Sequence, residues 1–140
     1  MRSGRLLLVF LSSLAASEPA VAGVFRCDLE QYASSLYEKD GGRWSNRSDQ
    51  LNNKIELVVT LNDDGTKGAT IHDTRSRSTS SGQWSMVRDY IAVTAPIDVG
   101  GVTLLSIFRD VDGKRPANYA FHAPALYGGA SAFAGFCTAQ

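Results

Sequence analysis

The sequence predicts an all-β fold, a small antiparallel β-barrel or sandwich of about seven or eight strands connected as a meander. Three observations support this prediction. Short alternating apolar segments are separated by turn residues, the first residues have the composition of a signal peptide, and the only two cysteines lie near the two ends of the chain that follows it.

Residues 1–22 are expected to be a cleavable signal peptide. Arg2 and Arg5 precede an apolar run at residues 6–11, and this order of charged and apolar residues is typical of export signals. The alternative is an uncleaved membrane anchor, but the apolar run is much shorter than the roughly 20 residues that a spanning helix needs. The sequence therefore predicts export.

The expected cleavage site follows Ala22, because Ala20 and Ala22 supply the pair of small residues that a signal peptidase accepts. Cleavage would leave one domain, residues 23–140, secreted or periplasmic and without a transmembrane segment. The precursor has 14 basic and 14 acidic residues, and losing Arg2, Arg5 and Glu18 leaves a net charge near −1. This balance argues against nucleic acid as a partner.

A disulfide between Cys27 and Cys137 is expected, because export places both thiols in an oxidising compartment. A metal site or a redox pair is not favoured, since there is no CxxC spacing and the chain has only two histidines. Disulfide geometry requires Cα atoms about 6 Å apart or closer. The two ends of the domain must therefore be neighbours, as the first and last strands of a barrel are.

Residues 54–61 form the clearest strand, with alternating apolar side chains. Residues 62–65 are turn formers, and residues 68–72 supply a partner strand for a hairpin. Residues 102–108 are apolar on both faces, which predicts a central strand covered on two sides. Further strands are expected at residues 84–87, 90–94, 118–122 and 131–137, with residues 88–89 left open between a turn and the middle of one longer strand.

Three segments are harder to assign. Residues 28–42 fit a short capped helix, and a strand through residues 35–37 fits nearly as well. Residues 43–53 are predicted to be a polar loop, and residues 73–82, which contain no apolar side chain, a mobile connection. Asp110 and Asp112 resemble the opening of a calcium loop, but the remaining ligands are missing, so a plain turn is expected.

Catalytic signatures are missing from the sequence. The chain contains no metalloprotease, serine-hydrolase, P-loop or dinucleotide-binding motif. His72 and His122 follow apolar strand residues, so both are expected to point outward, away from the core. We therefore expect no active site, no metal and no cofactor, and a hydrolase that uses His72 or His122 with a serine or carboxylate stays an alternative.

Two polar segments contain arginines that could form a binding surface if they were neighbours. Arg43, Trp44 and Arg47 lie in one segment, and Arg75 and Arg77 lie in the other. An aromatic residue flanked by arginines suits an anionic or protein partner. The alternative is that both segments are ordinary solvated loops.

The function expected from the sequence is a monomeric, non-catalytic exported binding protein that recognises a macromolecule or small ligand through its loops or barrel mouth. Small exported barrels that inhibit lysozymes or proteases offer an architectural analogy, without any shared motif. A carrier of lipids or small apolar ligands is a further alternative, which requires a hollow barrel. A filled interior would instead favour recognition by the outer surface.

Overall fold

The computed structural model describes residues 21–38, 43–47, 53–98, 100–123 and 129–140 of the 140-residue chain. These residues form strands, turns and connections. Within the described ranges there is no helix, and thus none long and apolar enough to cross a membrane. The prediction of an all-β fold is confirmed.

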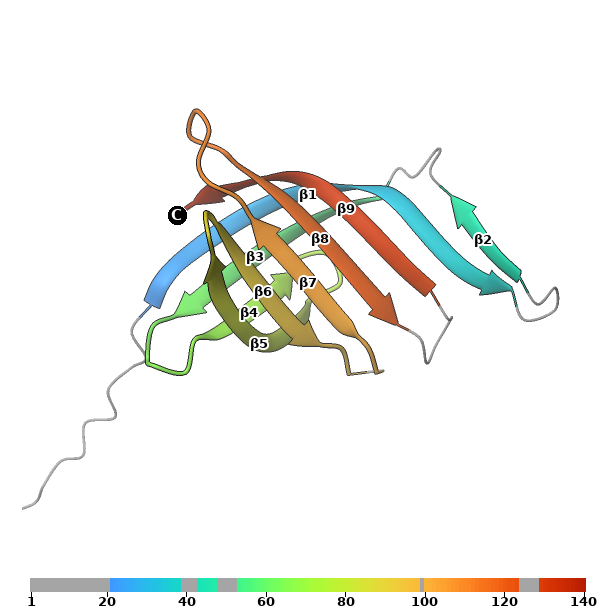
Figure 1. Cartoon of the computed structure of the whole chain (residues 1–140), viewed down its shortest axis with the longest axis horizontal. Helices are drawn as coiled ribbons and strands as arrows, with labels where there is room; N and C mark the ends of the chain where they lie inside the picture. The colour runs from blue at the N-terminus through green and yellow to red at the C-terminus, as the bar shows by residue number, and fades with distance from the viewer. Residues whose placement is uncertain (1–20, 39–42, 48–52, 99, 124–128) are drawn as a thin grey trace, which may run out of the picture.

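Eight strands form a closed antiparallel barrel (Figure 1). Neighbours along the chain pair in sequence from β3 to β9, β1 pairs with β3, and β9 pairs back to β1 to close the ring. The short β2 lies outside this ring and pairs with residues 34–38 of β1. The strands are β1 (Val21–Glu38), β2 (Arg43–Arg47), β3 (Lys54–Asn62), β4 (Gly68–Asp73), β5 (Ser78–Val87), β6 (Tyr90–Pro96), β7 (Val102–Ile107), β8 (Arg115–Ala123) and β9 (Gly129–Ala139).

Large apolar side chains fill the interior of the barrel. Alternate residues of each strand point inward, and the largest fully buried ones are Leu29, Leu57, Leu105, Ile107, Val59 and Val93. Three inward-facing aromatic residues, Tyr119, Phe121 and Phe133, pack with ring centroids 5.9 to 6.3 Å apart. The interior is therefore a packed core built from both halves of the chain.

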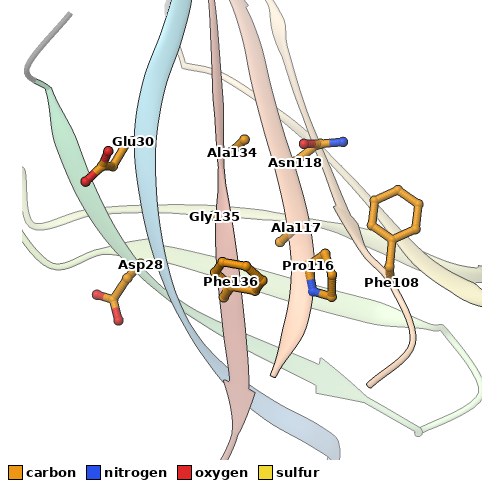
Figure 2. A pocket seen from close by; sticks show the side chains of 9 residues that line it. All are labelled: Asp28, Glu30, Phe108, Pro116, Ala117, Asn118, Ala134, Gly135 and Phe136. Atoms are coloured by element: carbon orange, nitrogen blue, oxygen red, sulfur yellow. The ribbon is translucent and has the colours of Figure 1, made fainter. Parts of the chain in front are cut away.

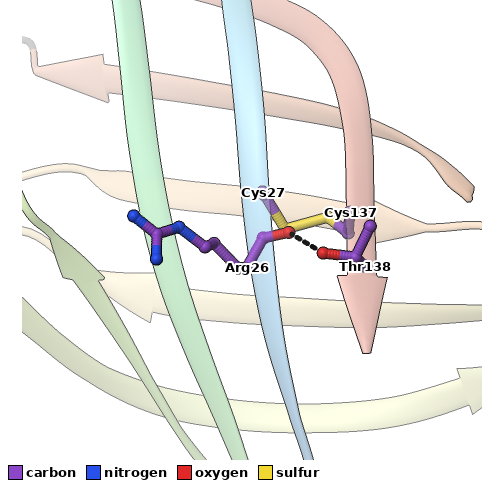
Figure 3. The surroundings of a disulfide bond; sticks show 4 residues. All are labelled: Arg26, Cys27, Cys137 and Thr138. Carbon is purple, nitrogen blue, oxygen red and sulfur yellow. Dashed lines mark hydrogen bonds between the residues drawn. A yellow bond between two sulfur atoms is a disulfide. The ribbon is translucent and has the colours of Figure 1, made fainter. Parts of the chain in front are cut away.

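The disulfide closes the barrel between its first and last strands, as predicted (Figure 3). Cys27 of β1 and Cys137 of β9 are direct partners in the ladder, with Cα atoms 3.9 Å apart, and neither side chain is exposed. Beside the disulfide, the Thr138 hydroxyl donates to the carbonyl oxygen of Arg26. The expected meeting of the two ends of the domain is confirmed.

Residues 28–38 form the second half of β1, so the alternative of a short helix within residues 28–42 is wrong. The strand wins because β9 and β3 both supply backbone partners along it, which local helix signals cannot outweigh. An irregularity between Gln31 and Ala33 shifts the register to β9 by one residue. Residues 39–42 lie outside the described part.

Two segments that the sequence predicted as loops contain strands. Residues 43–47 form β2, while residues 48–52 lie outside the description. The connection expected over residues 73–82 is reduced to a tight turn, because β4 ends at Asp73 and β5 begins at Ser78. Polar side chains can form β5 because its backbone pairs with β4 on one side and β6 on the other.

The predicted turns are confirmed. The chain reverses between β3 and β4 at residues 63–67, and Arg88 and Asp89 form the tight turn between β5 and β6, with Arg88 at φ 55°. In the predicted turn after β7, the Asp110 carboxylate accepts a hydrogen bond from the Gly113 amide at 2.8 Å. The two-strand alternative for residues 84–94 is therefore correct.

Candidate binding groove

The five residues of the predicted arginine surface lie in two separate elements. Arg43, Trp44 and Arg47 belong to β2, which stands away from the barrel at the far end of β1 (Figure 1), and their side chains lie outside the description. Arg75 and Arg77 are exposed in the turn between β4 and β5. Arg75 donates to the carbonyl oxygen of Lys54 at 3.0 Å. A joint arginine surface stays a prediction.

Both histidines point outward, as predicted. His72 of β4 is hydrogen-bonded to the hydroxyl of Thr79 at 2.9 Å, and its neighbour Ile71 is buried. His122 of β8 is exposed. Strands β4 and β8 are four steps apart in a ring of eight, so the two imidazoles lie on opposite sides of the barrel. They cannot act together.

A hollow lies on the outer wall, across β1, β9 and β8 (Figure 2). Its volume is about 550 Å³. We call it the acidic groove, and define it by the outward-facing side chains of β1, β9 and β8 together with the residue that follows β7. Its lining side chains are Asp28, Glu30, Phe108, Pro116, Asn118, Ala134 and Phe136.

One margin of the acidic groove carries two carboxylates from β1. Asp28 and Glu30 are two residues apart, so both point to the same outer face of the strand. Glu30 forms an exposed ion pair with its ladder partner Lys54 at 2.6 Å, and this hydrogen bond raises the pKa of Lys54. The carboxylate of Asp28 forms no hydrogen bond or ion pair with any residue that the structure describes.

The position of Asp28 is electrostatically unfavourable. Its direct ladder partner on β3 is Glu56, so two carboxylates face each other across the strands. The Arg26 guanidinium bonds Glu56 at 2.7 Å, and this hydrogen bond lowers the pKa of Glu56. Arg26 thus compensates Glu56, and the Asp28 carboxylate is left open at the edge of the groove.

The centre and the far margin of the acidic groove are apolar. Phe136 of β9 is 53% exposed, and Pro116 of β8 is its direct partner in the ladder. Phe108 stands at the far margin, where its ring packs against Tyr90 with centroids 5.4 Å apart. The ammonium of Lys114 lies 5.9 Å from the centre of the Phe136 ring. A cation over an aromatic face therefore already forms part of this surface.

Strand alternation from the two cysteines already indicates which residues of this groove face outward. Once Cys137 points into the barrel, strand alternation places Phe136 outside, where a large aromatic residue needs an explanation. The same alternation from Cys27 places Asp28 outside. What the sequence could not supply was the register that joins these residues across β1, β9 and β8.

The groove has the chemistry of a binding site for a cation with an apolar body. A carboxylate, an aromatic face and a proline ring lie along one shallow hollow, and such a set can hold a positive charge and cover the carbons that carry it. The described residues contain no cluster of three or more metal-ligating side chains. No family model matches the chain, and a search of the curated proteins finds no match.

Proposed function

We propose that the protein is a non-catalytic binding protein whose acidic groove recognises a lysine or arginine side chain presented by a partner protein. The observation that carries this proposal is the Asp28 carboxylate, which faces Glu56 and forms no hydrogen bond or ion pair with a described residue, because its cationic neighbour Arg26 is bonded to Glu56. A positive charge from a partner would relieve this repulsion. A cationic ligand would thus neutralise the charge of the Asp28 carboxylate.

The apolar part of the groove suits the stem of such a side chain. Lysine and arginine carry three or four methylene groups that pack on apolar surfaces while the charge stays in water. Phe136 and Pro116 lie beside each other on neighbouring strands and offer such a surface next to Asp28, which is the ladder partner of Phe136 on the other side. A metal ion has no carbon atoms to bury on Phe136 and Pro116, so the groove favours a side chain over a metal ion.

The packed interior supports recognition by the outer wall. A carrier would hold its ligand inside the barrel, where the structure places fully buried leucine, isoleucine and valine side chains. We also propose that the binding takes place outside the cytoplasm. The disulfide supports this location, because such bonds persist in oxidising compartments, and so does the predicted signal peptide.

The test uses short fluorescent peptides as probes. A peptide Gly-Leu-Lys-Leu-Gly is compared with its Gly-Leu-Glu-Leu-Gly counterpart by fluorescence anisotropy, using the purified chain with its disulfide intact. We expect the lysine probe to bind more tightly, with an affinity that falls as salt is added, because exposed charges are screened. Equal binding of the two probes would overturn the proposal.

Matched variants locate the binding. Asp28→Asn together with Phe136→Ser should weaken lysine-probe binding by about tenfold, the effect of losing roughly 1.4 kcal/mol. Asp98→Asn together with Met86→Ser is the control, because both residues are exposed and lie outside the groove lining. Lys114→Gln should strengthen binding, since it removes the resident cation beside Phe136. If both double variants behave alike, the groove is not the site.

A further inference from the structure

A second hollow lies on the same outer wall, across β7, β8, β9 and β1. Its volume is about 400 Å³, and its lining is almost entirely apolar. Val102 and Leu104 of β7 form one side and are 48% and 46% exposed. The sequence predicted this strand to be covered on both faces, and the structure shows that only the inner face is covered. We call this hollow the apolar groove.

The apolar groove continues the acidic groove along the same two strands. Ala120 and Ala132, which are ladder partners, line the apolar groove, and Asn118 and Ala134, the next partners on the same face, line the acidic groove. From Ala130 to Phe136 the combined surface follows six residue steps of β9, which is about 20 Å. The two hollows therefore lie end to end on one face of the barrel, and we call the two together the trough.

The shape of the trough determines what can occupy it. Its sides are on β7 and β1, with β8 and β9 between them, which places the sides about 14 Å apart. Both middle strands are paired on each side, so the wall has no free backbone edge to which an extended peptide could add. A helix satisfies its own backbone and has a diameter of about 10 Å.

Resting on the function proposed above, we propose that the trough binds one amphipathic basic helix of a partner protein. About 13 residues of helix span its 20 Å length. The apolar face of the helix lies on Val102, Leu104 and Ala120, and a lysine or arginine at one end reaches Asp28. Charge complementarity fixes the direction of the helix, because the carboxylates stand at the Phe136 end of the trough.

The test uses a stapled 14-residue helical peptide with leucines at spacings of three and four and two lysines at one end. Its control has the same composition, with the leucines scattered around the helix. We expect the amphipathic helix to bind at least about tenfold more tightly than the scattered one, and more tightly than the short lysine probe. Equal binding of the two helices would overturn the proposal.

Ala120→Arg separates this proposal from the proposed function. Ala120 is exposed in the middle of the apolar groove, so a large charged side chain should block the helix and leave the fold intact. We expect the helix to lose at least about tenfold in affinity, while the short lysine probe still binds at the acidic groove. If Ala120→Arg abolished binding of both peptides, the acidic groove and the apolar groove would not be separate binding sites. If helix binding were unchanged, the helix proposal would be overturned and the proposed function would stand.

The natural chain and the Ala120→Arg variant also distinguish other occupants of the trough. Sedimentation of the chain alone would reveal a dimer that Ala120→Arg abolishes, and this result would assign the trough to a second copy and overturn the helix proposal. Binding to anionic lipid vesicles that Ala120→Arg abolishes would likewise assign it to a membrane. We expect neither result, because the carboxylates of Asp28 and Glu30 repel anionic headgroups and the trough is matched to a positive charge.

Discussion

The seam between β1 and β9 and the wall made by β4 and β5 lie in the same barrel but are held together differently. At the seam, buried apolar side chains, a disulfide and backbone pairing all act together. In the β4–β5 wall the paired residues from Thr70 to Asp73 face only serines and a threonine on β5. Ala69 and Ile71 of β4 and Trp84 of β5 connect this wall to the core, and residues 78–82 are held by backbone pairing with β4.

This comparison shows that a strand can have two different origins. On the β9 side of the seam, the sequence of residues 131–137 already predicts a strand. Over residues 78–82 the local sequence favours a loop, and the strand exists because the backbone groups of β4 need partners there. We therefore expect the seam to be sensitive to covalent and packing changes, and the β4–β5 wall to be sensitive to changes that separate the backbones.

The largest effect is expected from removing the disulfide at the seam. Cys27→Ala with Cys137→Ala opens a loop with a sequence separation of 110 and should lower the free energy of unfolding by about 4–5 kcal/mol. Urea unfolding followed by fluorescence measures this loss. Adding a thiol reductant should destabilise the natural chain and leave the variant unaffected. A loss below about 1 kcal/mol would show that backbone pairing alone holds the seam.

An intermediate effect is expected from a single methyl group in β5. A Cβ atom on Gly82 would overlap the carbonyl oxygen of Thr94 and lie 2.7 Å from the Cα of Ala95, so Gly82→Ala should push β5 from β6 and cost about 2–3 kcal/mol. Gly68→Ala is the matched control, because its Cβ would meet only side-chain atoms at 3.4 Å or more. Similar unfolding midpoints for the two variants would contradict the close approach of β5 and β6.

The smallest effect is expected from Tyr119, which faces the interior of the barrel from β8. Burial, together with the charge of Asp73 on β4, raises the pKa of Tyr119 to about 12, above its ordinary value near 10. A group with a raised pKa contributes stability that is fully present below pH 10 and is lost as the pH rises to about 12. The free energy of unfolding should therefore fall by up to about 2 kcal/mol in this window.

Tyr119→Phe isolates this contribution, because phenylalanine keeps the ring and removes the ionisable hydroxyl. Denaturant unfolding at several pH values between 9 and 12 should show a shallower loss in the variant than in the natural chain. Tyr32→Phe is the control, since Tyr32 is 53% exposed. Parallel curves for the natural chain and Tyr119→Phe would show that ionisation of Tyr119 does not act on the fold.

Much of the architecture could be predicted from local patterns. The alternation of residues 54–61 and the turn residues after them were sufficient for the hairpin of β3 and β4, and the two cysteines were sufficient for ring closure. Residues 28–38 could not be assigned, because their partners on β9 are distant in sequence. Residues 78–82 were predicted as a loop because they contain no apolar side chain, although their partner β4 is the preceding strand. The backbone hydrogen bonds that stabilise these strands need a partner strand, and the sequence of the segment alone does not reveal that partner.

The candidate site was much harder to predict than the fold. Neither Asp28 nor Phe136 belongs to a recognisable motif, and they are more than 100 positions apart in the sequence. They become ladder partners only through the register of β1 and β9. For Val102 and Leu104 the prediction of a strand covered on both faces was wrong. An apolar outer face has the same sequence pattern whether a second layer or solvent covers it.

The ladder at the seam also suggests a way to reorder the chain. Phe25 and Ala139 are partners, and the Gln140 amide donates to the Val24 carbonyl at 2.9 Å, so in a chain that starts at residue 23 a short linker could join residue 140 to residue 23 without stretching either strand. New extremities could then be cut into the exposed turn at residues 63–67. A circular permutant of this kind would retain every strand pairing of the ring. In a closed ring of strands, the chain can begin at any hairpin turn.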